Sequence, residues 1–352
     1  MIEFGNTGMK VNRLGFGGIP IQRIDQQGAN ELLAFIRESG INFLDTARAY
    51  GQSETYIGEA IKGMRDSFYL ATKSMSRDYE GMKTDIEKSL SELQTDHIDL
   101  YQIHNVQFAE IEKVMSEDGA YRALSEAREQ GKIRHIGITT HTLESLEKIV
   151  EMGTKFFASI QFPFNIVESQ GTELLTRAHE KGMGTIIMKP LAGGAIEDPE
   201  LAVRYILDKT FTDIVIPGMG DIEEVRQNVE SAKAVLEAEN HEFNEQESLR
   251  IEEIKKELTG NFCRRCGYCK PCPQGIDIPL AFLSARYMKR YNLAEWGYGR
   301  YMASHIEKDG ELACIRCGAC LPKCPYFLPI PDMLEQVYRT KIETDAARNA
   351  GK

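Results

Sequence analysis

The chain has 352 residues, 42% of which are hydrophobic, and its formal net charge is −11. This length allows one large domain and a small one, and the acidic balance argues against a nucleic-acid-binding surface. The sequence contains no run of about eighteen apolar residues, so no membrane-spanning helix is expected. The first residues carry no basic or apolar targeting region, and we expect no leader peptide.

Short β-rich runs alternate with amphipathic helical stretches over residues 1–237. After a hairpin predicted at 2–11, strands are predicted at 13–17, 42–46, 68–73, 98–104, 135–139, 158–162, 185–189 and 213–217. Apolar residues recur between them at helical spacing, as in 79–93. Eight strand–helix units predict an α/β fold with a parallel sheet closed into a (β/α)8 TIM barrel. An open doubly wound sheet is the alternative.

A glycine-rich segment, Gly15-Phe16-Gly17-Gly18, ends the first predicted strand. It lacks the third glycine of a dinucleotide fingerprint, and no helix opens directly on it, so a Rossmann domain is not favoured. Residues 238–260 are charged and have a helical pattern. They predict a connecting helix between the barrel at 1–237 and a further domain at 261–352.

All eight cysteines lie in two groups near the C-terminus. Each group has three cysteines spaced by two residues and a fourth followed by proline: Cys263, Cys266, Cys269 and Cys272, then Cys314, Cys317, Cys320 and Cys324. This spacing is typical of [4Fe–4S] ligation, and thiolates are soft ligands that suit such clusters. The residues between the groups are rich in helix formers. We therefore predict a mainly α-helical ferredoxin-like domain that holds two 4Fe-4S clusters and moves single electrons.

Other uses of the cysteines fit this pattern less well. Structural zinc uses two CxxC pairs, which leaves half of each group unexplained, and disulfides suit small secreted scaffolds. A single cluster is a further alternative, since only two residues separate Cys269 from Cys272. In ferredoxins with two clusters, the fourth cysteine of each run serves the other cluster. That rule predicts that Cys324 completes the cluster of the first run and Cys272 that of the second.

Four complementary side chains stand at or just beyond the ends of successive predicted strands. Asp45 and Tyr50 follow the second strand, Lys73 ends the third and His104 ends the fourth. Active sites of barrels form where strands end, so these groups should meet on one rim. Any one of them could be a solvated rim residue, but the four complementary types together predict a catalytic site.

The segments FLDTARAYGQSE, YLATKS, LYQIHN, GKIRHIGITTH, IIMKPLAGG and IVIPGMG occur in this order over residues 1–235. In these segments the chain resembles the aldo-keto reductases, and as a whole it resembles their microbial subgroup with a C-terminal ferredoxin-like domain. The resemblance implies an oxidoreductase of carbonyl or alcohol substrates with Asp45, Tyr50, Lys73 and His104 as catalytic tetrad. Tyr50 would donate the proton, with its pKa lowered by Lys73, which Asp45 would fix in place. His104 would orient the carbonyl oxygen.

The resemblance also implies a nicotinamide cofactor, NAD(P), across the later strand ends. Gln161 would bond the ring carboxamide, and further contacts would come from Thr139, Thr140, Lys189, Pro190, Leu191, Gly193, Gly194, Ile216, Gly218, Gly220, Glu224 and Asn228. The glycines can also be read as turn residues. An acidic Glu224 near the ribose favours NADH over NADPH, and this choice stays open.

A nicotinamide passes two electrons as hydride, whereas a 4Fe-4S cluster takes one at a time. We therefore keep a flavin as a candidate cofactor, and expect an external ferredoxin-like carrier besides a small carbonyl or alcohol substrate. The alternatives are a redox-sensing or electron-delivery subunit with little turnover of its own, and purely structural clusters. Phe162, Phe164 and Tyr101 suggest an apolar element of the substrate pocket. Oxygen-sensitive clusters predict a cytoplasmic protein.

Overall fold

The computed structural model describes residues 1–237, 242–258, 263, 267–289 and 294–350. The chain folds as two compact units, Met1–Glu257 and Leu258–Lys352. Among the helices of the described residues, none is long and apolar enough to cross a membrane.

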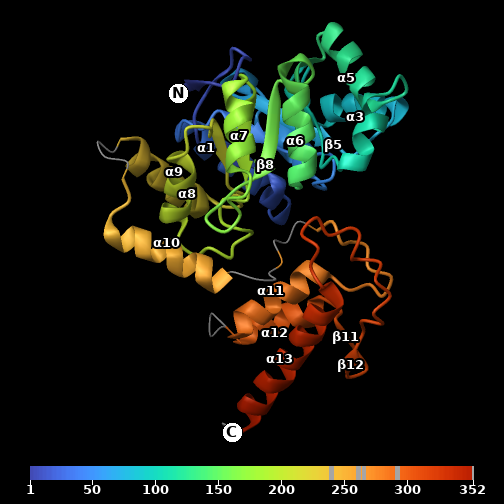
Figure 1. The fold of residues 1–352 in the computed structure, drawn as a ribbon, viewed down its shortest axis with the longest axis vertical. Helices are drawn as coiled ribbons and strands as arrows, with labels where there is room; N and C mark the ends of the chain where they lie inside the picture. Colours follow the sequence, from blue (N-terminus) through green and yellow to red (C-terminus); the bar gives the residue numbers. More distant parts are fainter. Residues whose placement is uncertain (238–241, 259–262, 264–266, 290–293, 351–352) are drawn as a thin grey trace. The chain divides into compact units, whose positions relative to one another are not determined.

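The first unit is built around a sheet of eight parallel strands (Figure 1). Each strand pairs with its neighbours in sequence, so the order of strands in the sheet is the order in the chain. The strands are β3 (Phe16–Gly17), β4 (Phe43–Asp45), β5 (Tyr69–Ser74), β6 (Ile98–Ile103), β7 (Ile133–Thr139), β8 (Ser159–Pro163), β9 (Gly184–Met188) and β10 (Ile214–Ile216). Most of their residues are buried, as expected for strands covered on both faces.

The first and last strands of this sheet meet and close the barrel. Gly17 N donates to Pro217 O at 2.9 Å, and Val215 N donates to Arg13 O at 2.8 Å. A Cβ atom on Gly17 would lie only 2.7 Å from the Pro217 oxygen, so this approach requires glycine. The glycine-rich segment 15–18 therefore serves the barrel seam. The predicted (β/α)8 barrel is confirmed.

An N-terminal hairpin fills the opposite end of the barrel from the strand carboxyl ends. β1 (Ile2–Glu3) pairs with β2 (Lys10–Val11) in antiparallel order. Phe4, between them, is fully buried, and its ring centroid lies 5.8 Å from that of Phe43, the first residue of β4. Apolar side chains from inside the barrel join the same cluster. The hairpin thus plugs the amino-terminal end, and the carboxyl-terminal end remains for a site.

Helices connect the strands and cover the outside of the barrel, and Figure 1 shows α6 and α7 flanking β8. They are α1 (Gln26–Glu38), α2 (Ser53–Ala60), α3 (Tyr79–Glu92), α4 (Ile111–Met115), α5 (Ala120–Glu129), α6 (Leu143–Met152), α7 (Thr172–Glu180), α8 (Pro199–Leu207) and α9 (Ile222–Leu236). Asp221 caps α9, because its side chain accepts from the Glu224 amide. α10 (Glu245–Leu258) lies in the predicted connecting segment, of which 238–241 and 259–260 fall outside the described residues.

The second unit is mainly helical, as predicted. Its elements are α11 (Ile278–Lys289), α12 (Ala294–Ala303), the short hairpin of β11 (Glu307–Lys308) and β12 (Glu311–Leu312), and α13 (Ile330–Ala350). α11 packs against both α12 and α13. Tyr301 of α12 is fully buried and donates to Glu307 Oε2 at 2.9 Å. Buried cysteines belong to the same apolar core, so the cysteine runs lie within the fold of this unit.

Candidate active site and cysteine cavities

The four candidate catalytic residues lie at the carboxyl-terminal end of the barrel, where barrel sites form. Asp45 is the last residue of β4, Lys73 is the second-last of β5 and His104 directly follows β6. Tyr50 lies in the connection from β4 to α2. Asp45, Lys73 and His104 are buried and Tyr50 is partly buried. The structure brings all four together.

Lys73 forms a buried ion pair with Asp45. Its Nζ lies 2.7 Å from Asp45 Oδ2 and donates a second hydrogen bond, of 2.6 Å, to the carbonyl oxygen of Thr46. The two side chains are only 1% and 4% exposed. Burial disfavours the ammonium, but the Asp45 carboxylate opposes this, and the pKa of Lys73 ends above its ordinary value. Lys73 is therefore a permanent positive charge in the site.

The ring of Tyr50 contacts both Lys73 and His104. Lys73 Nζ lies 4.9 Å from the centroid of the Tyr50 ring. The rings of Tyr50 and His104 meet edge to face, with centroids 5.9 Å apart and planes at 84°. A phenol, an imidazole and an ammonium thus share one small region.

Burial sets the protonation of these two rings. It raises the pKa of the Tyr50 hydroxyl, and the charge of Lys73 opposes that rise. It lowers the pKa of His104 well below 6.5, and Lys73 and Arg77 lower it further. At neutral pH, Tyr50 is a phenol with a proton to donate and His104 is a neutral imidazole. Lys73 lowers the pKa of Tyr50, as expected, but burial outweighs this charge and the Tyr50 pKa ends above its ordinary value.

Gln102 is a site residue that the sequence pattern did not single out. Its Nε2 donates to Gln161 Oε1 at 3.0 Å and lies 3.4 Å from Asp45 Oδ1. It joins β4, β6 and β8 inside the barrel. Its position two residues before His104, and so on the same face of the strand, is the signal that could have revealed it.

Thr139 and Thr140, at the end of β7, are buried and hold the loop that follows His104. Asn105 N donates to Thr139 Oγ1 at 2.7 Å, and Thr140 Oγ1 donates to Val106 O at 2.9 Å. Both threonine hydroxyls therefore already have contacts within the barrel. Gln161 lies on the neighbouring β8, with its oxygen engaged by the Gln102 amide.

The loop after β9 has a backbone that favours glycine. Lys189, Gly193 and Gly194 have φ angles of 58°, 68° and 82°, in the left-handed region that glycine adopts at little cost. Pro190 is buried and Leu191 is half-buried in the same loop. The turn explanation therefore accounts for both glycines, whether or not a ligand binds there.

A second loop leaves β10, which Ile216 ends, and passes Gly218 and Gly220 before α9 begins. The Gly220 amide donates to Glu224 Oε2 at 2.6 Å. Asn228 Nδ2 donates to the Glu224 carbonyl at 2.7 Å. Within the described residues, the buried Asn228 Oδ1 has no hydrogen-bond partner. This end of the barrel thus offers an acidic side chain and an unused amide oxygen.

Three aromatic residues proposed for the substrate pocket lie elsewhere. The buried Tyr101 has its hydroxyl 3.2 Å from a serine of α3. Phe164 stacks on Tyr205 of α8 with centroids 6.0 Å apart, and Phe162 belongs to the main core cluster. The expectation is wrong for these residues, because successive strand residues face opposite sides: Tyr101 faces the helices where its neighbour Gln102 faces the barrel interior.

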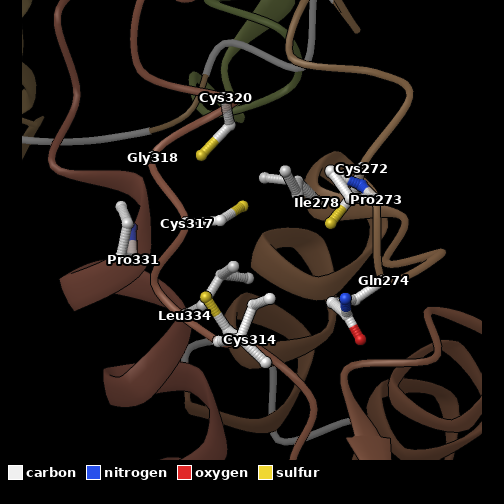
Figure 2. Close-up of a pocket in the computed structure, with 11 residues that line it drawn as sticks. Cys272, Pro273, Gln274, Ile278, Cys314, Cys317, Gly318, Cys320, Pro331 and Leu334 are labelled. Atoms are coloured by element: carbon white, nitrogen blue, oxygen red, sulfur yellow. The ribbon is translucent and has the colours of Figure 1, made fainter.

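In the second unit, a cavity is lined by cysteines of both runs (Figure 2). They are Cys272 of the first run and Cys314, Cys317 and Cys320 of the second. Figure 2 shows the sulfur atoms of Cys272 and Cys317 pointing toward the space between the two segments. Ile278 and Leu334 give this cavity apolar walls.

A second cavity repeats the arrangement with the roles of the runs exchanged. It is lined by Cys263 and Cys269 of the first run and Cys324 of the second, together with Phe282 and Ile330. Cys266 lies outside the described residues. Over the part of the chain that the structure describes, no group of three or more His, Cys, Asp or Glu side chains is arranged to hold a metal ion. The described cysteines line these two cavities.

Comparison with known proteins divides the chain in a similar way. Residues 13–200 match the model of the Aldo/keto reductase family, and residues 262–328 match that of the 4Fe-4S dicluster domain. The chain is 28% identical to L-galactose dehydrogenase of Arabidopsis thaliana over 299 residues, which cover 71% of this chain and 92% of that protein. It is 31% identical to aldo-keto reductase YhdN of Bacillus subtilis over 215 residues, or 55% of this chain and 62% of that one.

A solved structure agrees with the sequence comparison. The holo form of aldo-keto reductase AKR11C1 from Bacillus halodurans superposes with a TM-score of 0.61 at 25% identity, covering 72% of this chain and 95% of that one. The family model spans more than half of the chain, over the strands that carry the tetrad positions. This chain belongs to the aldo/keto reductase family, with a 4Fe-4S dicluster domain following its barrel.

Proposed function

We propose that the chain interconverts a small carbonyl compound and its alcohol with a nicotinamide cofactor, NAD(P), and passes electrons singly through two 4Fe-4S clusters. The observation that carries this proposal is the meeting of Tyr50, His104 and the buried Lys73–Asp45 pair at one rim. We assign the carbonyl chemistry to 1–237 and electron transfer to 261–352, with 238–260 as the connection.

In the reducing direction, Tyr50 gives its hydroxyl proton to the carbonyl oxygen while hydride reaches the carbonyl carbon. The ammonium of Lys73 stabilises the tyrosinate that remains, and Asp45 holds this ammonium in place. His104 is neutral because burial lowers its pKa, so it can donate a hydrogen bond that orients the substrate oxygen. A bound nicotinamide would supply the hydride, or accept it when an alcohol is oxidised.

Residues at the later strand ends fit such a cofactor. The buried Asn228 Oδ1 lacks a partner within the described residues, and a buried oxygen of this kind favours a ligand that donates to it. Gln161 would bind the ring carboxamide. The other lining residues would be Thr139, Thr140, Lys189, Pro190, Leu191, Gly193, Gly194, Ile216, Gly218, Gly220 and Glu224. The acidic Glu224 favours the ribose hydroxyls of NADH over the phosphate of NADPH.

The two cysteine cavities fit two 4Fe-4S clusters. One cluster would be held by Cys272, Cys314, Cys317 and Cys320, and the other by Cys263, Cys266, Cys269 and Cys324. The cavity linings support this crossed pairing, which two-cluster ferredoxins also use. Structural zinc uses two CxxC pairs, whereas three cysteines spaced by two residues and a fourth followed by proline favour a cluster.

The number of electrons exchanged by the two units is compatible with joining carbonyl chemistry to cluster electron transfer. Oxidation of an alcohol releases two electrons and two protons, and two clusters that each carry one electron match that number. An external ferredoxin-like carrier would then remove the electrons one by one. A flavin could divide the electron pair first, so it stays a candidate cofactor. Because clusters need reduced thiolates, we place the protein in the cytoplasm.

The test is anaerobic turnover of simple aldehydes with NADH and NADPH by the cluster-loaded protein and its Tyr50→Phe variant. Loss of a general acid should slow turnover by about 10²- to 10⁴-fold, while circular dichroism and iron content stay unchanged. Wild-type rates in Tyr50→Phe would refute the assignment. No turnover by the wild type, with clusters that still cycle, would instead favour an electron-delivery or redox-sensing subunit.

A further inference from the structure

The segment that carries Tyr50 is fixed to the strand that carries Lys73. Thr46 N donates to Ala71 O at 2.8 Å, and Arg48 N donates to Lys73 O at 2.9 Å. Residues 46–48 therefore continue the pairing of the sheet beyond β4. Tyr50 comes two residues later, so its position depends on how Arg48 is held.

The guanidinium of Arg48 is held by two carboxylates. Its Nη1 donates to Glu54 Oε2, near the start of α2, and to Glu92 Oε2, at the end of α3, the latter at 2.7 Å. The other oxygen of Glu54 accepts from Thr72 Oγ1 at 2.6 Å. These contacts join four elements, namely the Tyr50 segment, α2, α3 and β5.

The burial of Glu54 distinguishes it from Glu92. The Glu54 side chain is 1% exposed, whereas Glu92 is 36% exposed and Arg48 is 19% exposed. Burying a carboxylate is costly unless it is paired and hydrogen-bonded, and both oxygens of Glu54 are bonded. Replacing such a pair by apolar side chains is often neutral for stability. Stability alone therefore gives no reason for an ion pair here.

The location of the Arg48–Glu54 pair gives a functional reason for an ion pair at this position. Thr72 directly precedes Lys73 on β5, so the two side chains face opposite sides of the strand. The network around Glu54 thus lies directly behind the Lys73–Asp45 pair. On the other side of Tyr50, Ser53 N donates to the Tyr50 carbonyl at 3.0 Å, and Glu54 is the next residue. Arg48 and Glu54 consequently hold the chain on both sides of Tyr50.

We propose that the Arg48–Glu54 pair is a positioning device that keeps the Tyr50 phenol against Lys73 and His104. The inference rests on the proposed role of Tyr50 as proton donor. Neither Arg48 nor Glu54 is required to touch the substrate, because both act through the backbone of residues 46–54. Without the pair, this segment can move and the phenol loses its place in the site.

Amide hydrogen exchange of the full-length, cluster-loaded protein tests whether the Arg48–Glu54 pair holds residues 46–54 in place. Arg48→Met and Glu54→Gln should speed exchange in residues 46–54 about tenfold, because opening of this segment becomes easier. Glu92→Gln is the matched control, since it removes the more exposed partner of the same guanidinium, and it should change exchange little. Arg48→Lys should be intermediate. Unchanged exchange in both Arg48→Met and Glu54→Gln would overturn the proposal.

Anaerobic reduction of benzaldehyde tests whether the pair positions Tyr50 for catalysis. Arg48→Met should lower kcat roughly 10- to 100-fold, because a small displacement of a catalytic group is that costly, while KM for the nicotinamide is unchanged. In a Tyr50→Phe background, Arg48→Met should cause no further loss, as expected for residues that act as a unit. Faster exchange with an unchanged kcat would overturn the positioning role. Full turnover in Tyr50→Phe would refute the proton donor itself.

Discussion

Lys73 Nζ is shared between the Asp45 carboxylate and the carbonyl oxygen of Thr46, the first residue beyond β4. The same ammonium is thus the counter-ion of a buried acid and a hydrogen-bond donor that holds the loop carrying Tyr50. Its removal would leave a carboxylate with 4% exposure and no cation beside it. Under the proposed function, catalysis and folding would therefore both depend on this one charge.

Lys73→Met should destabilise the barrel by about 3–5 kcal/mol, the usual result of leaving one member of a buried pair without its partner. Adding Asp45→Asn should recover much of this loss, because the unpaired charge disappears. Urea unfolding followed by a barrel-specific probe measures both variants. A double variant as unstable as the sum of two independent losses would contradict the buried-pair interpretation.

The barrel should lose stability in mild acid. Burial lowers the pKa of His104 and of His141 well below 6.5. Below pH 6.5 the two histidines bind protons in the unfolded chain but stay neutral in the folded one. Their contribution to the free energy of unfolding is therefore complete above this pH and declines as the pH falls toward the folded pKa values. Melting curves at about pH 7.5 and about pH 5 should show this decline. His141→Asn should flatten it, and an identical slope in that variant would exclude His141 as a source.

The crossed pairing of the cysteine runs can be tested by paired substitutions. Cys272→Ser combined with Cys314→Ser should remove a single cluster, lowering bound iron from about eight to about four per chain. Cys272→Ser combined with Cys324→Ser should affect both clusters. Iron and sulfide analysis of anaerobically purified protein distinguishes the pairs. Loss of both clusters in the Cys272–Cys314 pair as well would show that each run builds its own cluster.

The acidic Glu224 should set the preference between the two nicotinamides. A 2′-phosphate beside its carboxylate would be repelled, so Glu224→Gln should raise the efficiency with NADPH relative to NADH by roughly tenfold. Glu223→Gln is the control, because this neighbour is 83% exposed and pairs with Arg226 instead. An equal response of both variants would place the cofactor away from Glu224.

The barrel could be predicted from the sequence because its strands are short apolar runs placed between amphipathic helices. The candidate tetrad could be proposed for a related reason: Asp45, Lys73 and His104 are polar residues at the ends of otherwise buried strands, and strand ends of a barrel meet. The cysteine spacing likewise specified its ligand type before any fold was known. In each case a local pattern carries the information.

Features that depend on several elements at once could not be read in advance. The Arg48–Glu54–Thr72 contacts join a loop, a helix and a strand, and no spacing in the sequence reveals them. The side to which Tyr101 points follows from strand register, which one residue reverses. The direction of the Tyr50 pKa shift depends on the balance between burial and the charge of Lys73, and only the packed structure supplies both quantities.

Each of the two cysteine cavities is lined by cysteines of both runs, and this constrains when the cavities can form during synthesis of the second unit. Since each cavity draws cysteines from segments on both sides of α11 and α12, neither segment can enclose a cavity alone. A ribosome must release the whole region before either site is complete. Proteolytic nicking between the segments, followed by separation of the fragments, would dismantle both sites together.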